Sequence, residues 1–446
     1  MTAHNSGTRI HSRQRFSFYV RNTGRVLRDN LSSSGNFSGT QLLRGRCPCS
    51  GIQSGSVAKG FEVEDCNRLW KGVRNVGSSS EKRRRGRSGF GWRAQATSGT
   101  QSKPAVEPVG FNDGSSTRFA PLINGCWTLA GGHGRIVESE IVQVMEMYAR
   151  SGLTSFDTAD IYGPSESILG AFRERWVKES EQSDGSRDVQ VFTKFCPNIF
   201  RMKMTPQVVE QSIRRSMAAL GVPKLDLVQM HWWDYDIPGM VDVAKSLADL
   251  REKGLITSVG VTNMSTEALA QIVDAGVPVV CNQVQFSMLD QRPRTAMLKY
   301  CEERDIKLFT YGTLAGGLLS NRYLEEGKKG LFGKVKYTTP DLNTSSLKMY
   351  WRIVREAGGE DYWRKLLSAL GEIAAAKEVS ISAVALRWAM QQGPVHPIVG
   401  LRNATHLDDN LTALTFTLGA AEIDKIEEVL RTSRGPSGDC YEMERS

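Results

Sequence analysis

The fold of this chain is decided by the stretch FDTADIYG, residues 156–163. The apolar residues around Phe156 predict a short buried strand, and a polar turn that ends at Gly163 follows it. A strand that ends in such a turn commonly holds reactive side chains on a rigid frame. Tyr162 by itself is a weak acid, with an ordinary pKa of about 10. A nearby ammonium would lower the pKa of Tyr162, so a lysine is expected at an equivalent strand end.

Strands alternate with amphipathic helices from about residue 119 to residue 430. This alternation predicts a single-domain α/β fold, a parallel (β/α)8 TIM barrel over residues 115–435. A doubly wound sheet is disfavoured because no strand is followed by G-x-G-x-x-G. Thr205 and Pro206 mark a helix start, and Gly221 marks its end. The expected strands are residues 122–129, 154–157, 189–194, 225–231, 256–261, 279–285, 307–311 and 395–399.

Two segments are expected to lie at the open end of this barrel. Residues 321–360 are rich in Gly and Lys and weakly patterned, which predicts a long loop over the barrel mouth. Residues 433–446 form a short C-terminal tail that either folds back over the mouth or stays disordered. The loops after the first and fourth strands complete the expected rim, whose shape the sequence does not determine.

Four polar side chains fall at three consecutive strand ends. Asp157 and Tyr162 follow the second strand, Lys194 ends the third and His231 ends the fourth. Carboxyl ends of barrel strands open into one mouth, so these groups can converge. Each has a structural interpretation when taken singly: an ion-pair partner, a core histidine or a turn aromatic. Together they favour a catalytic site.

The first 95 residues differ from the rest of the chain. Residues 1–100 contain 18 Lys and Arg against 5 Asp and Glu, a charge of +13, so residues 101–446 carry −4 of the net +9. A leader rich in Arg, Ser and Gly and poor in acids is typical of a chloroplast transit peptide and is expected to be disordered. The basic run at residues 82–87 could instead be a nuclear signal or an RNA-binding tract. The acidic body gives no electrostatic support for nucleic-acid binding.

Composition excludes several other classes of protein. No run of about 18 apolar residues is present, so no membrane-spanning helix is expected. The 8 cysteines are scattered, which favours buried free thiols over a disulfide framework or a metal site. They are Cys47, Cys49, Cys66, Cys126, Cys196, Cys281, Cys301 and Cys440.

Over about residues 115–435 the chain resembles the aldo-keto reductases. The phrases FDTADIYG, FTKF and VQMHWWD carry the likeness, and Asp157, Tyr162, Lys194 and His231 match the family tetrad. The resemblance implies an NADP(H)-dependent carbonyl reductase without a Rossmann fold. Tyr162 would donate a proton, His231 would orient the carbonyl, and Lys194 would assist Tyr162 with Asp157 as its anchor.

The resemblance also implies the cofactor and substrate positions. Arg402 and His406 form a basic pair that suits a 2′-phosphate, so NADPH is favoured over NADH. Glycines such as Gly316 would permit close approach of the pyrophosphate, and Tyr311 would stack on nicotinamide. The expected cofactor residues are Trp127, Asp157, Thr262, Asn263, Gln283, Tyr311, Thr313, Leu314, Gly316, Arg322, Gly400, Arg402, His406, Asp409 and Asn410; the expected substrate residues are Trp127, Tyr162, His231 and Trp232.

Three functional hypotheses follow from this resemblance. The first is an enzyme that reduces a small aldehyde or ketone in a plastid. The second is a redox-sensing regulatory subunit similar to the potassium-channel β subunits, which bind cofactor. Those relatives carry Asn where this chain has His231, so His231 favours turnover. The third, a catalytically idle scaffold, is disfavoured by the intact cofactor segments. Trp233 is expected to be rim packing, and neither the substrate nor the oligomeric state is determined.

Overall fold

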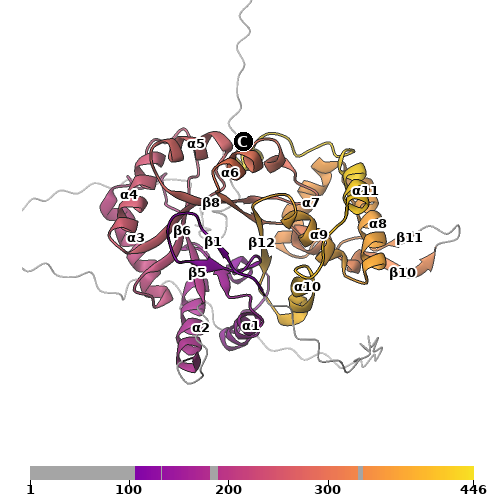
Figure 1. The fold of residues 1–446 in the computed structure, drawn as a ribbon, viewed down its shortest axis with the longest axis horizontal. Coiled ribbons are helices and arrows are strands. Elements are labelled where there is room, and N and C mark those ends of the chain that lie inside the picture. The colour runs from indigo at the N-terminus through magenta and orange to yellow at the C-terminus, as the bar shows by residue number, and fades with distance from the viewer. Residues whose placement is uncertain (1–105, 132, 181–188, 330–334, 446) are drawn as a thin grey trace, which may run out of the picture. The chain divides into compact units, whose positions relative to one another are not determined.

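The computed structural model describes residues 106–131, 133–180, 189–329 and 335–445. Within them, eight parallel strands close into a barrel in the order β12-β3-β4-β5-β6-β7-β8-β9, and helices surround it (Figure 1). The predicted (β/α)8 fold is therefore confirmed. The strands are β3 (Ile123–Gly125), β4 (Ser155–Asp157), β5 (Gln190–Phe195), β6 (Leu225–His231), β7 (Ile256–Thr262), β8 (Val279–Gln285), β9 (Lys307–Tyr311) and β12 (Val395–Gly400).

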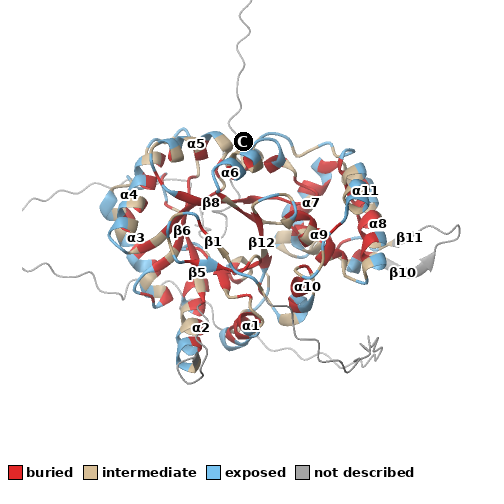
Figure 2. Cartoon of the chain, in the orientation of Figure 1, coloured by how far each residue is buried: buried red, intermediate tan, exposed pale blue. Residues whose placement is uncertain are grey.

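The helices follow the predicted alternation. Their inner faces pack on the buried strands, and their outer faces are exposed (Figure 2). They are α1 (Glu138–Arg150), α2 (Ser165–Ser180), α3 (Pro206–Leu220), α4 (Met240–Glu252), α5 (Thr266–Asp274), α6 (Met297–Glu303), α7 (Ser345–Ala357), α8 (Gly359–Lys377), α9 (Ile381–Met390), α10 (Leu407–Thr412), α11 (Ala420–Leu430) and α12 (Glu442–Arg445).

The boundaries of α3 show how local sequence sets a helix. The Thr205 side chain accepts a hydrogen bond from the Val208 amide, and Pro206 occupies the first turn, where it removes no helical hydrogen bond. Gly221 ends the helix at φ 63°, a left-handed conformation that an L side chain adopts only with strain. The predicted start and end of this helix are thus confirmed.

A short hairpin closes the amino end of the barrel. It pairs β1 (Val109–Gly110) with β2 (Arg118–Phe119), and the Asp113 carboxylate accepts a hydrogen bond from Ser258 near the start of β7. The rings of Phe111 and Phe119 stack with their centroids 4.8 Å apart and pack against the aromatic side chains of β5 and β9. Because the hairpin covers the amino end, a binding site is expected at the carboxyl end of the barrel.

Two local predictions were wrong. Residues 122–129 were expected to be one strand, but β3 ends at Gly125 and η2 (Trp127–Leu129) is a 3₁₀ turn. The chain turns here through hydrogen bonds from the Leu129 amide to the Cys126 carbonyl and from the Ala130 amide to the Trp127 carbonyl. Residues 321–360 are not a plain loop either. They contain η5 (Asn321–Tyr323), the hairpin of β10 (Leu324–Lys329) and β11 (Val335–Tyr337), and α7.

Helix α7 forms because one of its faces is apolar. Leu347, Tyr350 and Val354 are buried at spacings of three and four residues, and the Thr344 side chain caps the amino end. Charged residues between these positions make the helical hydrophobic pattern weak in the sequence. The polar residues of α7 therefore obscured, in the sequence, the pattern of a helix with one buried face.

Predictions about membrane helices, cysteines and the leader can be compared with the described residues. Among the described helices, none combines the length and apolar character that a membrane crossing requires. The described cysteines are free thiols, and all of them except Cys196 are buried, as expected. The predicted leader, residues 1–95, lies outside the described residues, together with the basic run at 82–87 and the first three cysteines.

Candidate active site

Three neighbouring strands bring the predicted tetrad to one rim of the barrel. Asp157 ends β4, Lys194 is the penultimate residue of β5 and His231 ends β6. Because these strands are parallel and directly paired, their carboxyl ends meet at the same end of the barrel. Tyr162 lies in the turn between β4 and α2.

Lys194 and Asp157 form a buried ion pair under Tyr162. The Lys194 Nζ lies 2.5 Å from Asp157 Oδ2 and donates a second hydrogen bond, of 2.8 Å, to the Thr158 carbonyl. Both charged side chains are 4% exposed, so little water competes for them. The same ammonium lies over the Tyr162 ring, 4.9 Å from its centroid. A cation in this position is electrostatically attracted to the ring and favours negative charge on the phenol oxygen.

A glutamine network holds the other oxygen of Asp157. Gln229 and Gln283 each donate a 2.8 Å hydrogen bond to Asp157 Oδ1, and Gln283 also donates to Gln229 Oε1. All of these side chains are buried. Sequence reasoning missed Gln229, although it lies two residues before His231 and therefore on the same face of β6. That spacing is the signal that could have found it.

His231 is held as a neutral ring. Burial, together with the positive charge of Arg445, lowers the pKa of His231 to about 3. Its Nδ1 lies 3.3 Å from the Thr262 carbonyl, and a carbonyl can only accept, so this contact requires the ring proton on Nδ1. The Nε2 atom is then a hydrogen-bond acceptor. At neutral pH this histidine is not set up to act as an acid.

The two tryptophans after His231 have different surroundings. Trp232, expected to line the substrate pocket, is 1% exposed and bonds through its indole to the Ile237 carbonyl. Trp233, expected to be rim packing, lies edge-on to His231 with the ring centroids 4.2 Å apart. Both indoles lie beyond the end of β6, and Trp233 donates a 2.8 Å hydrogen bond from its Nε1 to the Pro197 carbonyl.

Among the residues expected at the nicotinamide, Asn263 and Tyr311 are bonded to one another. The Tyr311 hydroxyl donates a 2.9 Å hydrogen bond to Asn263 Oδ1, which joins the end of β9 to the residue that follows β7. Thr262 is turned away, because its hydroxyl donates to the Gln283 carbonyl. Trp127 stands on η2, edge-on to His133, whose Nε2 lies 2.8 Å from the Ser346 hydroxyl. Sequence reasoning did not identify His133.

The glycine loop after β9 is covered by helix α7. A Cβ on Gly316 would lie 2.9 Å from the Tyr350 ring, so the close approach at this glycine is made by an aromatic side chain of the protein. The expected loop residue Thr313 is buried, and its hydroxyl lies 3.1 Å from that of Thr310; Leu314 is half-buried. Arg322, in η5, is exposed.

The segment after β12 presents cationic groups at a separate part of the rim. The Arg402 guanidinium donates to the carbonyls of Arg135, at 3.0 Å, and Thr128, at 3.5 Å. No carboxylate of the described residues forms an ion pair with it, so its charge suits a phosphate. The other residues expected here are Gly400 and His406, which are exposed, Asp409, which is half-buried, and Asn410, which is buried.

The closed parallel barrel with its surrounding helices defines a (β/α)8 protein, and a buried Lys–Asp pair, a tyrosine and a neutral histidine lie at its carboxyl rim. The chain belongs to the Aldo/keto reductase family, whose family model matches residues 121–431. It is therefore an oxidoreductase of the family that interconverts carbonyls and alcohols.

Two of the similar proteins come from plants. A pyridoxal reductase of Arabidopsis thaliana, described as chloroplastic, is 29% identical over 332 residues, which cover 70% of this chain and 84% of the relative. A probable aldo-keto reductase of Glycine max is 25% identical over 327 residues, covering 71% of this chain and 87% of the relative.

A solved structure has the same fold. The glycerol dehydrogenase of Gluconobacter oxydans aligns with a TM-score of 0.59 at 22% identity and covers 74% of this chain and 97% of its own. At this identity the likeness bears on the fold alone.

Proposed function

We propose that this chain is an NADPH-dependent reductase of aldehydes or ketones, with Tyr162 as the proton donor. The observation that carries the proposal is the Lys194 ammonium, anchored by Asp157 and lying 4.9 Å from the Tyr162 ring centroid. A positive charge in a dry site makes it easier for a phenol to release its proton to a carbonyl oxygen. When bound, the reduced nicotinamide supplies the hydride.

The state of His231 supports Tyr162 as the acid. A buried, neutral imidazole with its proton on Nδ1 has no proton to give to a carbonyl at the mouth. Its Nε2 lone pair instead accepts a hydrogen bond from the alcohol that the reaction forms. His231 thereby orients the oxygen of the alcohol, and the phenol of Tyr162 is left as the group that moves the proton.

The residues around the rim divide the remaining work. Tyr311 offers a flat face to a nicotinamide, and its hydrogen bond fixes Asn263, the candidate contact to the carboxamide. Gln283 and Thr262 bond within the protein, which favours a positioning role for both. Arg402 would hold the phosphates, and the exposed His406 and Arg322 belong to the same expected set.

Replacement of one phenol tests the acid. Tyr162→Phe should lower the rate of NADPH oxidation with methyl 4-formylbenzoate by about 10²- to 10⁴-fold, the range in which general acid catalysis contributes. Tyr300→Phe makes the same chemical change on α6, outside the site, and should keep the wild-type rate. Equal rates for the wild type and Tyr162→Phe would show that the acid is another group.

We further propose that residues 1–95 direct the enzyme to plastids and that residues 115–435 are the mature barrel. The acid-poor leader and a relative described as chloroplastic support this proposal. Residues 1–100 fused to a fluorescent protein should be imported into isolated chloroplasts and shortened on entry. A fusion that stays outside the organelle, or that enters nuclei instead, would contradict it.

A further inference from the structure

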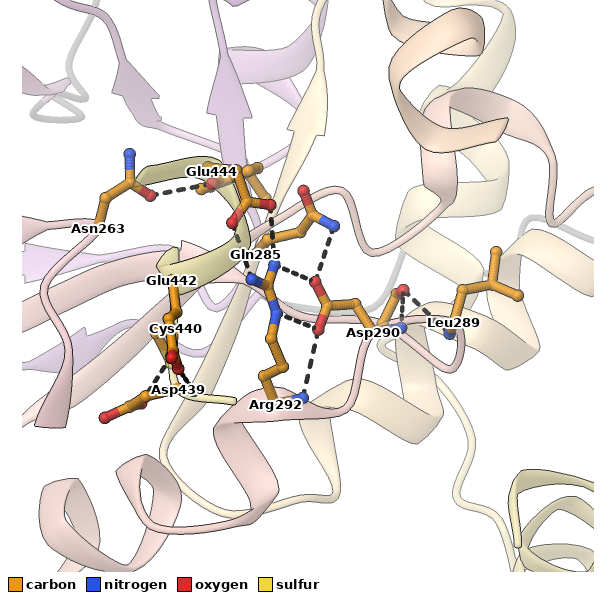
Figure 3. Close-up of polar contacts among 11 residues, drawn as sticks. Asn263, Gln285, Leu289, Asp290, Arg292, Asp439, Cys440, Glu442 and Glu444 are labelled. Atoms are coloured by element: carbon orange, nitrogen blue, oxygen red, sulfur yellow. Dashed lines mark hydrogen bonds and ion pairs between the residues drawn. The ribbon is translucent and has the colours of Figure 1, made fainter. Parts of the chain in front are cut away.

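The C-terminal tail is fastened over the barrel mouth at two points. The Asp439 carboxylate accepts hydrogen bonds from the amide and the hydroxyl of Thr266 at the start of α5, at 2.7 and 3.2 Å. Glu444 accepts two hydrogen bonds from Arg292, which is 2% exposed and also bonds Asp290 (Figure 3). Removing either charge of such a buried pair is strongly destabilising, so the last helical turn is held in place.

This anchored turn brings two side chains against the catalytic residues. The Tyr441 ring lies perpendicular to that of His231, with the centroids 5.6 Å apart. Arg445 donates a 2.7 Å hydrogen bond from Nη2 to the carbonyl of Trp232, the residue that follows His231. Its guanidinium lies 4.1 Å from the Tyr235 ring centroid and 5.0 Å from that of Tyr441. The tail therefore forms part of the pocket wall beside His231.

The guanidinium of Arg445 is only partly satisfied. Its Nε and Nη1 atoms are buried, and neither has a hydrogen-bond partner among the described residues. Glu444, the adjacent carboxylate, is engaged by Arg292. Burial accordingly lowers the pKa of Arg445 below its usual value. A buried cationic donor pair without an acceptor is costly, and one carboxylate or phosphate would satisfy both donors at once.

The position of Arg445 points to the substrate as the source of that anion. Arg445 lies beside His231, where it bonds to the Trp232 carbonyl and its positive charge helps to lower the pKa of His231. Arg402, the cationic group expected to hold the cofactor phosphates, lies at another part of the rim. It donates hydrogen bonds to the carbonyls of Thr128 and Arg135, next to β3 and β12. An anion beside Arg445 would therefore belong to the molecule whose carbonyl lies between Tyr162 and His231.

We propose that Arg445 recognises a carboxylate or phosphate group of the carbonyl substrate, so that the enzyme selects anionic aldehydes or ketones over neutral ones. This inference rests on the proposed function, because it takes Tyr162 and His231 to mark the reacting carbon. The planar guanidinium pairs with either anion through two parallel hydrogen bonds, whereas a lysine would offer a single point charge.

The test compares three aldehydes on the full-length chain. The substrates are methyl 4-formylbenzoate, which is neutral, 4-formylbenzoate and 4-formylphenyl phosphate, each with NADPH. For the wild type, kcat/KM for at least one anion should exceed that for the neutral ester. In Arg445→Met the ratio of anion to ester should fall about 10- to 100-fold, mainly through KM, because charge-assisted hydrogen bonds are lost. Arg431→Met, an exposed site near the tail, is the matched control.

The outcomes separate this inference from the function on which it rests. Turnover of the ester with an anion-to-ester ratio that Arg445→Met leaves unchanged overturns the role of Arg445 and leaves the reductase in place. An equal rise in kcat/KM for all three aldehydes in Arg445→Met would show that Arg445 blocks the site. That result would also overturn its proposed role in substrate recognition. If the wild type reduces none of them, the proposed function and this inference fall together. The anionic aldehyde whose kcat/KM falls more in Arg445→Met shows whether the site prefers a carboxylate or a phosphate.

A binding measurement gives a readout that does not depend on turnover. Benzoate and phenyl phosphate cannot be reduced, yet either should quench the tryptophan fluorescence of the wild type, because Trp233 lies against His231. The apparent Kd should weaken at least tenfold in Arg445→Met and stay the same in Arg431→Met. Equal Kd values in all three proteins would contradict an anion site at Arg445.

Discussion

The Lys194 ammonium lies over the ring of Tyr162, 4.9 Å from its centroid, and the same Nζ lies 2.5 Å from Asp157 Oδ2. This relationship gives the buried charge two roles. It neutralises a carboxylate inside the barrel, which affects stability, and it places a cation against a phenol, which affects chemistry. The two roles can be separated by mutation.

Lys194→Met should abolish activity and lower the free energy of unfolding by about 3–5 kcal/mol, because Asp157 is left buried without its partner. The double variant Lys194→Met/Asp157→Asn removes both charges and should recover much of that stability, as measured by urea denaturation. Its activity should stay as low as that of the single variant. Recovery of activity together with stability would mean that the ammonium acts only on folding.

His231 should make the folded protein sensitive to acid. Its pKa is lowered to about 3 in the folded state by burial, with the charge of Arg445 second, against an ordinary value of 6.5. Below pH 6.5 the unfolded chain therefore binds a proton that the folded chain does not. The contribution is complete above that pH and is lost as pH falls toward 3, by on the order of 2 kcal/mol between pH 7 and pH 5.

Urea denaturation at pH 7 and pH 5 measures this effect. His231→Asn should lose less stability than the wild type over that interval, although it is less stable at pH 7. His406→Asn, at an exposed position, should keep the wild-type dependence. His396 is also buried, and burial lowers its pKa to about 4, so the change should be reduced in His231→Asn and not abolished. An unchanged pH dependence in His231→Asn would show that this ring is already charged in the folded protein.

Arg402 should decide between the two pyridine nucleotides. Its guanidinium is held by two main-chain carbonyls and has no ion-pair partner among the described residues, so it is free to pair with a 2′-phosphate. Arg402→Ala should weaken NADPH binding by about 10-fold or more and should change NADH binding little. Titrations that quench tryptophan fluorescence measure both affinities. Equal losses for the two nucleotides would remove the argument for NADPH.

Gly312 should tolerate no side chain, because α7 lies directly over the loop. A Cβ there would lie 2.6 Å from the Tyr350 ring, and the backbone has φ +72°. Gly312→Ala should destabilise the protein by about 2–4 kcal/mol, from the left-handed backbone together with the clash. Gly276→Ala has a similar φ of +86° with nothing within 4 Å, so it measures the backbone cost alone. Thermal or urea denaturation that gives equal losses for the two variants would show that α7 moves away at no cost.

Local patterns were sufficient to predict much of this protein. The alternation of strands and helices predicted the barrel, and the caps of α3 were predicted at the residue level, because they depend on neighbours within four positions. The positions of Asp157, Lys194 and His231 at three strand ends followed from the same alternation. The likeness of the motifs around them to a known family added the chemical roles, which remain predictions.

Other features depend on contacts between residues distant in the sequence. Nothing near Tyr350 in the sequence indicates that its ring fills the space above Gly312 and Gly316. Gln229 joins the Asp157 network only because β6 lies beside β5 and close to β4 in the closed barrel. The surroundings of Trp232 and Trp233 depend on how the chain leaves β6, which period-two alternation does not fix beyond the strand.

The sequence by itself determined the barrel and the chemical groups at its mouth, since strand periodicity, capping residues and strand-end motifs are local properties of the chain. Only the tertiary structure decided the state and surroundings of those groups: a neutral His231, a buried Lys194–Asp157 pair, and a C-terminal turn that brings Arg445 beside them. Burial and charge arise from atoms that are close in space, and four barrel strands, β7, β8, β9 and β12, lie between His231 and Arg445 in the sequence. That separation is why no local pattern revealed a guanidinium whose Nε and Nη1 have no hydrogen-bond partner among the described residues.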